Sequence, residues 1–239
     1  EAKAGAQLKQ YFADPNEENW QRYTGGLESI VRLITMAPER AGALDFIREL
    51  TKKGITVSIG HTTADAETTH AAAEAGATHV THTFNAQTPL NHRAPGVPGA
   101  ALVDDRLQCE VISDGIHLHP DIVKLIIRTK GGEKLVAITD AMEAAGMPDG
   151  QYQLGGQDVF VHEGAARLKD GTLAGSTLTM VRAFQNLMRF GATPEEAALM
   201  TTQTPALSIG NEELGEIELG APAIFSRFDE NYAFKGTVG

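Results

Sequence analysis

The sequence predicts an α/β fold in which parallel strands alternate with helices. Five short runs are rich in β-branched residues and are typical of buried parallel strands. They cover residues 30–35, 55–59, 78–81, 107–112 and 134–138. Their starts recur every 23 to 29 residues, about the length of one strand–helix unit. No G-x-G-x-x-G motif follows the first run, so a dinucleotide-binding fold is not favoured.

Helix signals separate the first three runs. A helix is expected over residues 38–53, because proline and glutamate suit its first turn and Gly54 suits its end. A second helix is expected after residue 63, with Thr63 or Asp65 as its cap and Gly76 as its end. Each helix therefore joins one strand to the next.

The next units contain a longer connection. Residues 87–98 hold three prolines and a glycine, which predicts an irregular loop. A short helix is expected near 99–104, and a further helix over 120–130 that ends at a pair of glycines. The fifth strand follows that helix.

Beyond Asp140 the pattern changes. Residues 151–175 alternate between apolar and polar side chains, which predicts β-hairpins. A helix is expected to follow up to residue 190, with Ser176 or Thr177 as its cap. The next helix carries a capping box, with Thr193 as cap, and another is expected near residue 204. Short strands are expected over 216–219, 223–225 and 232–234.

Composition bounds the class of protein. The chain has 239 residues, of which 42% are hydrophobic, enough for one large domain, alone or with a small second one. Its net charge of -11 argues against nucleic acid or an anionic membrane as partner. The single cysteine, Cys109, excludes an intrachain disulfide and fits a reducing compartment, so a cytoplasmic protein is expected. No apolar run is long enough for a spanning helix.

The polar residues at the strand ends are the candidates for chemistry. His61 and His82 follow successive strands, and the carboxyl ends of parallel strands meet at one edge. Two imidazoles there suit a divalent cation, although two unconnected polar residues would give the same spacing. Asp140 follows the last strand and could act as a general base or cap a turn. His117 is the better placed of the two histidines after the fourth strand, and Asp114 could hold a ring N–H or simply cap a turn.

Other polar groups could bind an anion. Arg93 lies in the proline-rich loop and is either a phosphate clamp or an exposed charge. Asn85 and Ala86 could offer an amide side chain and backbone N–H groups. Residues 173–176 are either one wall of a polar ligand site or simply a turn of small residues.

As a set, these segments resemble the N-acetylglucosamine-6-phosphate deacetylases of the amidohydrolase superfamily. The resemblance covers nearly the whole chain in the right order. The matching segments are Gly60-His61-Thr62, His82-Thr83-Phe84-Asn85-Ala86, Arg93-Ala94-Pro95-Gly96, Ser113-Asp114-Gly115-Ile116-His117, Thr139-Asp140-Ala141-Met142 and residues 171–180. Together they are highly specific, whereas each alone is not.

The resemblance implies a fold and a reaction. The fold is a (β/α)₈ amidohydrolase barrel, of which residues 1–214 would supply strands four to eight. Residues 215–239 would add strands to a small β domain built from both chain ends. The reaction is hydrolysis of the N-acetyl group of N-acetylglucosamine 6-phosphate, which yields glucosamine 6-phosphate and acetate. The resemblance also implies a homodimer.

The resemblance assigns roles to individual residues. His61 and His82 would bind a divalent metal, zinc or iron. Asp140 would take a proton from the attacking water and later give it to the leaving amine, while His117 would bind substrate and help polarise the carbonyl. The phosphate would be held by Asn85, Ala86 and Arg93, with Arg93 reaching a neighbouring subunit's site. Leu173, Ala174 and Gly175 would line the sugar and acetyl pocket.

The chain departs from the family at two points. The family's further metal ligand, a glutamate in a His-Leu-Glu-Gly-Pro stretch, would lie just before Glu1, together with the first three barrel strands. We therefore expect the chain to be part of a longer gene product; a truncated chain is the alternative. Ala94 replaces an acidic residue that the family often carries. Competing hypotheses are another metal-dependent amidohydrolase, dihydroorotase-like or aminoacylase-like, and an inactive sugar-phosphate binding protein.

Overall fold

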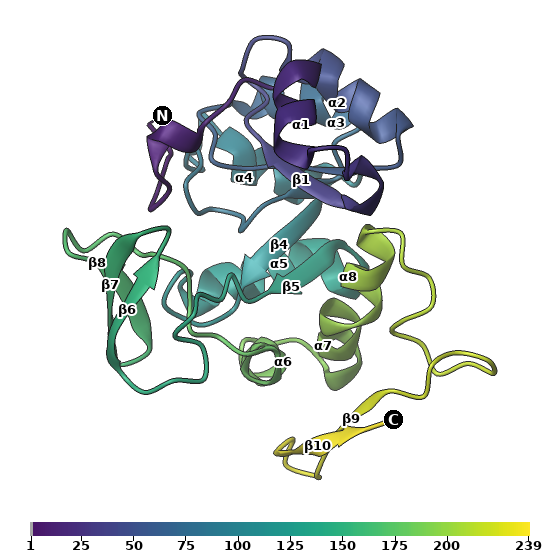
Figure 1. Ribbon diagram of the computed structural model, residues 1–239. Helices are drawn as coiled ribbons and strands as arrows, with labels where there is room; N and C mark the ends of the chain where they lie inside the picture. Colours follow the sequence, from purple (N-terminus) through teal and green to yellow (C-terminus); the bar gives the residue numbers. More distant parts are fainter. Residues whose placement is uncertain (1) are drawn as a thin grey trace.

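The computed structural model describes residues 2–239, and its largest sheet is the predicted parallel one (Figure 1). Five strands lie in chain order, and every neighbouring pair is parallel. They are β1 (Leu33–Met36), β2 (Thr56–Ile59), β3 (His79–Val80), β4 (Gln108–Ile112) and β5 (Leu135–Ile138). All five strands predicted from the sequence are therefore confirmed.

Helices precede the first of these strands, connect the strands to one another and follow the last of them. They are α1 (Glu17–Thr24), α2 (Ala43–Lys52), α3 (Ala66–Ala75), α4 (Gly96–Val103), α5 (Pro120–Lys134), α6 (Met180–Arg189), α7 (Pro194–Thr201) and α8 (Gln203–Ser208). Two short 3₁₀ turns, η1 (Lys9–Tyr11) and η2 (Glu28–Ile30), flank α1. Figure 1 shows α5 packed behind β4 and β5, with α6, α7 and α8 following it.

The main core lies between the sheet and its helices. The strand residues that face the helices are fully buried, among them Val57, Val80 and Val111. Ile47 and Leu50 of α2 meet them from the helical side. Burial of apolar side chains of this size contributes about 1.5–3 kcal/mol each, so this layer supplies most of the stability of the fold.

The opposite face of the first four strands is polar. Successive side chains of a strand point to opposite faces, so Thr35, Ser58 and Glu110 lie on the side away from the helices. The Ser58 hydroxyl donates to a carboxylate oxygen of Glu110 over 3.0 Å. The interior of a barrel is usually filled by branched apolar side chains. The sequence pattern was interpreted as buried strands and did not distinguish the two faces.

Several helix ends agree with the sequence. Asp65 caps α3 by accepting from the Thr68 backbone N–H, and Gly76 ends the helix with a φ of 117°. The capping box of α7 is formed between Thr193 and Glu196. These ends are local signals, and local signals are read directly from the chain.

The start of α2 differs from the expectation. The helix begins at Ala43, not at residue 38. Glu39 lies in a turn, where its carboxylate accepts from the backbone N–H of Thr63 over 2.7 Å and from the Thr62 hydroxyl. Glu39 therefore binds the loop after β2. The helix begins only after Gly42, which is its N-cap and has a φ of 81°.

Two further helices also have different starts. The short helix expected at 99–104 begins at Gly96, where the tight approach of the Thr88 and Pro89 carbonyls leaves no space for a Cβ. The helix expected to be capped by Ser176 or Thr177 begins at Met180, with Thr179 as its cap. Ser176 is held instead by the end of β5, where its backbone N–H donates to the Asp140 carbonyl over 2.7 Å.

Two small antiparallel sheets follow the parallel one. The predicted hairpins are confirmed as β6 (Gly150–Leu154), β7 (Gln157–His162) and β8 (Ala165–Leu168), which form a sheet beside the ends of the parallel strands (Figure 1). Near the C-terminus, β9 (Phe225–Phe228) pairs with β10 (Phe234–Val238). The strand expected at 216–219 is wrong: these residues form no strand, and Ile217 and Leu219 are exposed. Within residues 2–239, no helix is long and apolar enough to cross a membrane.

Candidate active site

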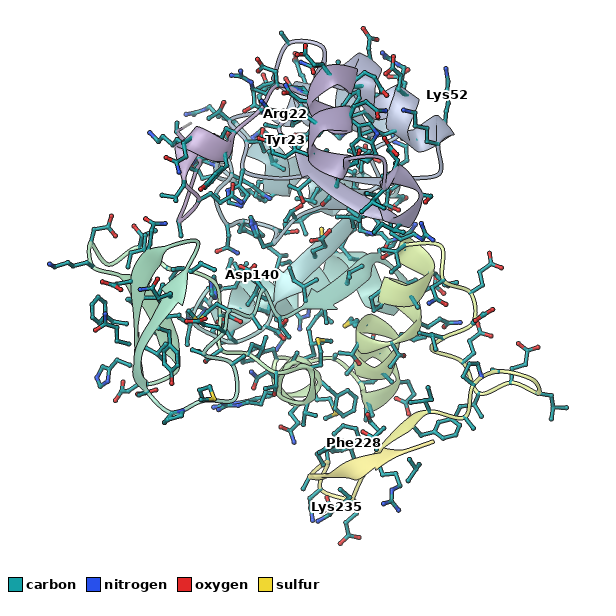
Figure 2. All side chains as sticks on the ribbon, in the orientation of Figure 1. Arg22, Tyr23, Lys52, Asp140, Phe228 and Lys235 are labelled. Carbon is teal, nitrogen blue, oxygen red and sulfur yellow. The ribbon has the colours of Figure 1, made fainter. Side chains whose placement is uncertain are left out.

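The polar residues that follow the parallel strands meet at one cavity. This cavity has a volume of about 750 Å³ and lies between the strand ends, the sheet β6–β8 and the segment 2–8. Most of the residues selected from the sequence line it: His61, His82, Asn85, Ala86, His117, Asp140, Leu173 and Gly175. Figure 2 shows Asp140 near the middle of the molecule, where β5 ends. The expectation that the strand ends converge is therefore correct.

A shared backbone device places three of these side chains. His61, His82 and Asp140 each lie two residues beyond the end of a strand, with φ values of 47°, 32° and 48°. Positive φ is uncommon for residues other than glycine and costs of order 1–3 kcal/mol where it is strained. The surrounding structure must hold these turns in place. Such concentration of strain at one cavity is typical of a functional site.

The two histidine rings face each other. The Nε2 atoms of His61 and His82 are 2.9 Å apart, and the rings meet edge to face. His61 Nδ1 lies 2.8 Å from the Lys3 carbonyl, which can only accept, so the proton of a neutral His61 ring is on Nδ1 and the lone pair is on Nε2. Burial and the nearby His61 ring lower the pKa of His82 to about 4, so His82 is neutral at pH 7. Imidazole binds metals in its neutral form, so the His82 ring has the charge state that metal binding needs.

The histidine pair fits part of a metal site. Two imidazole nitrogens facing one point suit zinc and other borderline divalent cations. Within residues 2–239, no cluster of three or more His, Cys, Asp or Glu side chains is arranged to hold a metal ion. The described residues therefore offer two imidazole rings at this point, and a metal held there would need further ligands to complete its coordination shell.

Asp140 lies on the wall of the same cavity. Its side chain remains accessible, while partial desolvation raises its pKa and the nearby His117 and His61 act in the opposite direction. A carboxylate with a raised pKa is better suited to exchange protons near neutrality. The backbone of Asp140 is fixed by Ser176, whose N–H donates to its carbonyl.

His117 is held by Asp114. The two side chains are almost fully buried, and His117 Nδ1 lies 2.7 Å from an Asp114 carboxylate oxygen. The other Asp114 oxygen accepts from the backbone N–H groups of Ile116 and His117. Burial raises the pKa of Asp114, but its hydrogen bonds with His117 outweigh this and leave the pKa lowered. Asp114 therefore both caps the turn and orients the ring, so the two roles left open by the sequence are combined.

The remaining candidates divide into two groups. Asn85 is fixed by its own turn, since its side-chain amide donates to the His82 carbonyl over 3.0 Å. Leu173 and Gly175 face the cavity, whereas Ala174 is fully buried in the small core against β6–β8. Arg93 is exposed in the loop before α4 and is not part of the cavity lining. The structure thus brings Arg93 and Ala174 less close to the site than the other candidates.

Sequence reasoning missed the segment 2–8. Its Gln7 side chain lies 3.3 Å from His61 Nε2, and Lys3 supplies the carbonyl for the His61 ring. Gln157 of β7 anchors the segment by donating to the Ala6 carbonyl over 2.6 Å. A polar stretch without periodicity carries no signal for such a position, so its contact with His61 could only be found in three dimensions. A second cavity, of about 820 Å³, lies along the free edge of β1 and shares His61 and Gln7.

The parallel sheet and the site at its carboxyl edge define a segment of a (β/α)-barrel protein. The profile of the amidohydrolase family matches residues 10–236, so the chain belongs to the amidohydrolase family.

Characterised relatives point in the same direction. The chain is 41% identical over 226 residues to N-acetylglucosamine-6-phosphate deacetylase of Bacillus subtilis, covering 92% of this chain and 56% of that protein. It is 43% identical over 195 residues to N-acetylgalactosamine-6-phosphate deacetylase of Escherichia coli O157:H7, covering 81% of this chain and 52% of that protein. The chain therefore spans little more than half the length of these relatives.

Solved structures confirm the fold. The crystal structure of N-acetyl-D-glucosamine-6-phosphate deacetylase from Mycobacterium smegmatis superposes with a TM-score of 0.91 at 37% identity, covering 99% of this chain and 64% of that one. The enzyme from Thermotoga maritima gives a TM-score of 0.91 at 34% identity, with 99% and 64% coverage. The predicted resemblance and the predicted amidohydrolase barrel are both confirmed.

Proposed function

We propose that the protein to which this chain belongs hydrolyses the N-acetyl group of N-acetylglucosamine 6-phosphate. One observation carries the proposal: the facing His61 and His82 rings, the Asp140 carboxylate and the His117 ring, which Asp114 holds, line one cavity. Amide hydrolysis needs a Lewis acid, a group that moves protons and a polar donor near the carbonyl. The names of the relatives supply the substrate.

Each of these residues has a distinct role in the proposed reaction. A divalent cation held by His61 and His82, zinc or iron in this proposal, would polarise the acetyl carbonyl and lower the pKa of water. Asp140 takes the proton from the attacking water and gives it to the departing amine nitrogen. His117, whose ring is fixed by Asp114, places its free nitrogen against the acetyl group. The sequence printed here contains no His-Leu-Glu-Gly-Pro stretch, which would carry the further metal ligand that the resemblance implies.

The phosphate end of the substrate requires cationic or N–H groups. In an acidic protein the anion must be held locally. Asn85 and the backbone of Ala86 are at the cavity wall and are assigned to the phosphate. Arg93 is assigned to the same phosphate from a neighbouring subunit, because its exposed position leaves it free to extend from one chain to another. This assignment makes the protein a homodimer.

The other walls of the cavity receive the sugar and the acetyl group. Leu173 and Gly175 contribute their exposed atoms, while the buried Ala174 fixes the turn that carries them. Residues 1–214 form the barrel part in this proposal. Residues 215–239 are assigned to a small β domain, because β9 and β10 form a two-stranded sheet separate from the parallel one, and Phe228 and Tyr232 contact Phe184 of α6. The free buried Cys109 favours a cytoplasmic location.

The proposal is tested by acetate release from N-acetylglucosamine 6-phosphate, with and without a chelator. We expect turnover that the chelator abolishes and that added zinc or iron restores. N-acetylglucosamine without its phosphate serves as the control and should be a much poorer substrate. Absence of turnover after addition of either metal would contradict the substrate assignment.

A second substrate is favoured by the relatives. Three of the similar proteins are named as N-acetylgalactosamine-6-phosphate deacetylases, one of them marked putative and 44% identical over 144 residues. The two sugars differ only in the orientation of one hydroxyl group. Parallel measurements of kcat/KM for both phosphosugars decide between them, and a ratio above one for N-acetylglucosamine 6-phosphate is expected.

A further inference from the structure

Beneath the two histidines lies a chain of hydroxyl groups that the proposed reaction does not use. Thr35 Oγ1 is 2.9 Å from Thr81 Oγ1, and Thr81 Oγ1 is 2.5 Å from Ser58 Oγ. Ser58 Oγ is in turn 3.0 Å from a carboxylate oxygen of Glu110. The four residues belong to, or directly follow, strands β1 to β4. The chain therefore ties four strands together one layer below the cavity.

The carboxylate gives this chain a direction. Burial raises the pKa of Glu110, and the Ser58 hydroxyl donates to one of its carboxyl oxygens, so the single Ser58 hydroxyl proton is used there. Ser58 must then accept from Thr81, and Thr81 must accept from Thr35. In this order each of the three hydroxyl protons has an acceptor within the chain, because Glu110 accepts the last of them. Glu110 thus orders the whole chain.

Glu110 lies close to the site residues themselves. It is 7% exposed, and the backbone N–H of His82 interacts with its carboxylate. The backbone carbonyl of Glu110 accepts from the Thr83 N–H over 2.8 Å. One residue of β4 therefore contacts the turn on which His82 is placed, both through its backbone and through its side chain.

The two threonines of this hydroxyl chain also pack tightly against the turn that carries His61. A Cβ at Gly60, directly before His61, would approach Thr35 Cγ2 and Thr81 Cβ to 2.7 Å. The threonines thus press against the turn that carries His61, while Thr81 directly precedes His82. A shift of Thr81 would move both histidine turns, and each of these turns holds a residue at positive φ.

We propose that Glu110 is a positioning residue: through Ser58 and Thr81, and through the His82 backbone, its carboxylate holds the His61–His82 pair in the geometry that binds a metal. The proposal rests on the proposed function only for the identity of the ligand, a divalent cation. Groups that orient metal ligands from behind change metal affinity or activity by about 10- to 100-fold when they are removed.

The test uses two substitutions at one position. Glu110→Ala removes the acceptor, whereas Glu110→Gln retains an amide oxygen in nearly the same volume. Gln108→Ala is the matched control, because Gln108 lies two residues earlier on the same face of β4 and its side-chain oxygen has no partner within residues 2–239. All three proteins are compared with the wild type in thermal stability, zinc affinity and amide hydrogen exchange of residues 81–83.

We expect Glu110→Ala to weaken zinc binding by about 10- to 100-fold and to accelerate amide exchange at residues 81–83. Glu110→Gln should restore both properties close to wild-type values. Gln108→Ala should lower the melting temperature without changing either. With the phosphosugar substrate, Glu110→Ala should lower kcat.

Two results would overturn the proposal. One is a Glu110→Ala protein whose exchange at residues 81–83 equals that of the wild type. The other is a Gln108→Ala protein that loses as much zinc affinity as Glu110→Ala. The exchange measurement needs neither metal nor substrate. If the wild type fails to release acetate, the proposed function fails, while the exchange data still decide whether Glu110 holds the turn.

Discussion

The two faces of the parallel sheet differ in composition and in role: one forms the core and the other supports the site. The face toward the helices is apolar, and its Val57, Val80 and Leu135 side chains are fully buried. The opposite face of β1 to β4 is polar and supports the histidines through Ser58 and Glu110. The same strands supply both faces by simple alternation. Substitutions on the apolar face should therefore change stability alone, whereas substitution of Ser58 or Glu110 on the polar face should also change the site.

The largest effect is expected at the edge of the polar face. Asp140→Asn should reduce acetate release by about 10²- to 10⁴-fold, the range typical of a lost general base. The melting temperature should remain close to that of the wild type, because the Asp140 side chain is accessible and its backbone bond to Ser176 is retained. Steady-state kinetics and a thermal melt check both points. Retained turnover would remove Asp140 from the mechanism.

A substitution on the apolar face should lower stability and leave the site unchanged. Leu135→Ala should lower the free energy of unfolding by about 2–5 kcal/mol, because Leu135 is fully buried in the main core. Zinc affinity of the folded protein should not change. Chemical denaturation and a zinc titration test this separation of the two faces. A loss of zinc affinity at Leu135 would show that the faces are coupled.

The polar face should also make stability depend on pH. Burial lowers the pKa of His79, in β3, to about 4, from an ordinary value near 6.5. The unfolded chain takes up the proton at a higher pH than the folded chain, so this contribution is complete above pH 6.5 and is lost as pH falls toward 4. The His79 contribution to the free energy of unfolding amounts to about 3 kcal/mol. His79→Gln should therefore flatten the decline of stability between pH 6.5 and 4, whereas an unchanged slope would contradict the assignment.

A smaller effect is expected where the hydroxyl chain is cut. Ser58→Ala leaves Glu110 and Thr81 without their shared partner, which should cost about 1–3 kcal/mol of stability and reduce turnover. Thr69→Ala is the control, since its fully buried hydroxyl donates to the carbonyl of Asp65, the cap of its own helix. That substitution should lower stability without lowering turnover. Equal effects on turnover would mean that Ser58 is merely structural.

The sequence predicts the apolar face well and the polar face poorly. Runs such as residues 55–59 mark strands through their β-branched residues, and Asp65 or Thr193 mark helix starts through local hydrogen bonds. The residues at the strand ends follow from the rule that parallel strands share one functional edge. These signals depend only on neighbours in the chain, so the five strands and most of the cavity lining could be predicted.

What was missed depends on contacts between distant residues. Glu39 resembles an ordinary first-turn glutamate until its carboxylate is seen to bind Thr62 and Thr63. Ser176 resembles a helix cap, but its backbone N–H donates to the Asp140 carbonyl, just after β5. Gln7 lies in a stretch without pattern and meets His61 across 54 positions of sequence. Side-chain pairing over such distances has no local signature, and neither has the positive φ of His61 or His82.

Zinc titration of the wild type and of His61→Asn, with a competing chromophoric chelator, tests the central claim most directly. The claim is that the strand ends of this chain form a metal-binding hydrolytic site around the facing Nε2 atoms of His61 and His82. Stoichiometric binding by the wild type, with a large loss of affinity in His61→Asn and an unchanged affinity in His162→Asn, whose ring is exposed on β7, is the predicted result. Equal zinc affinity in all three proteins would contradict the account.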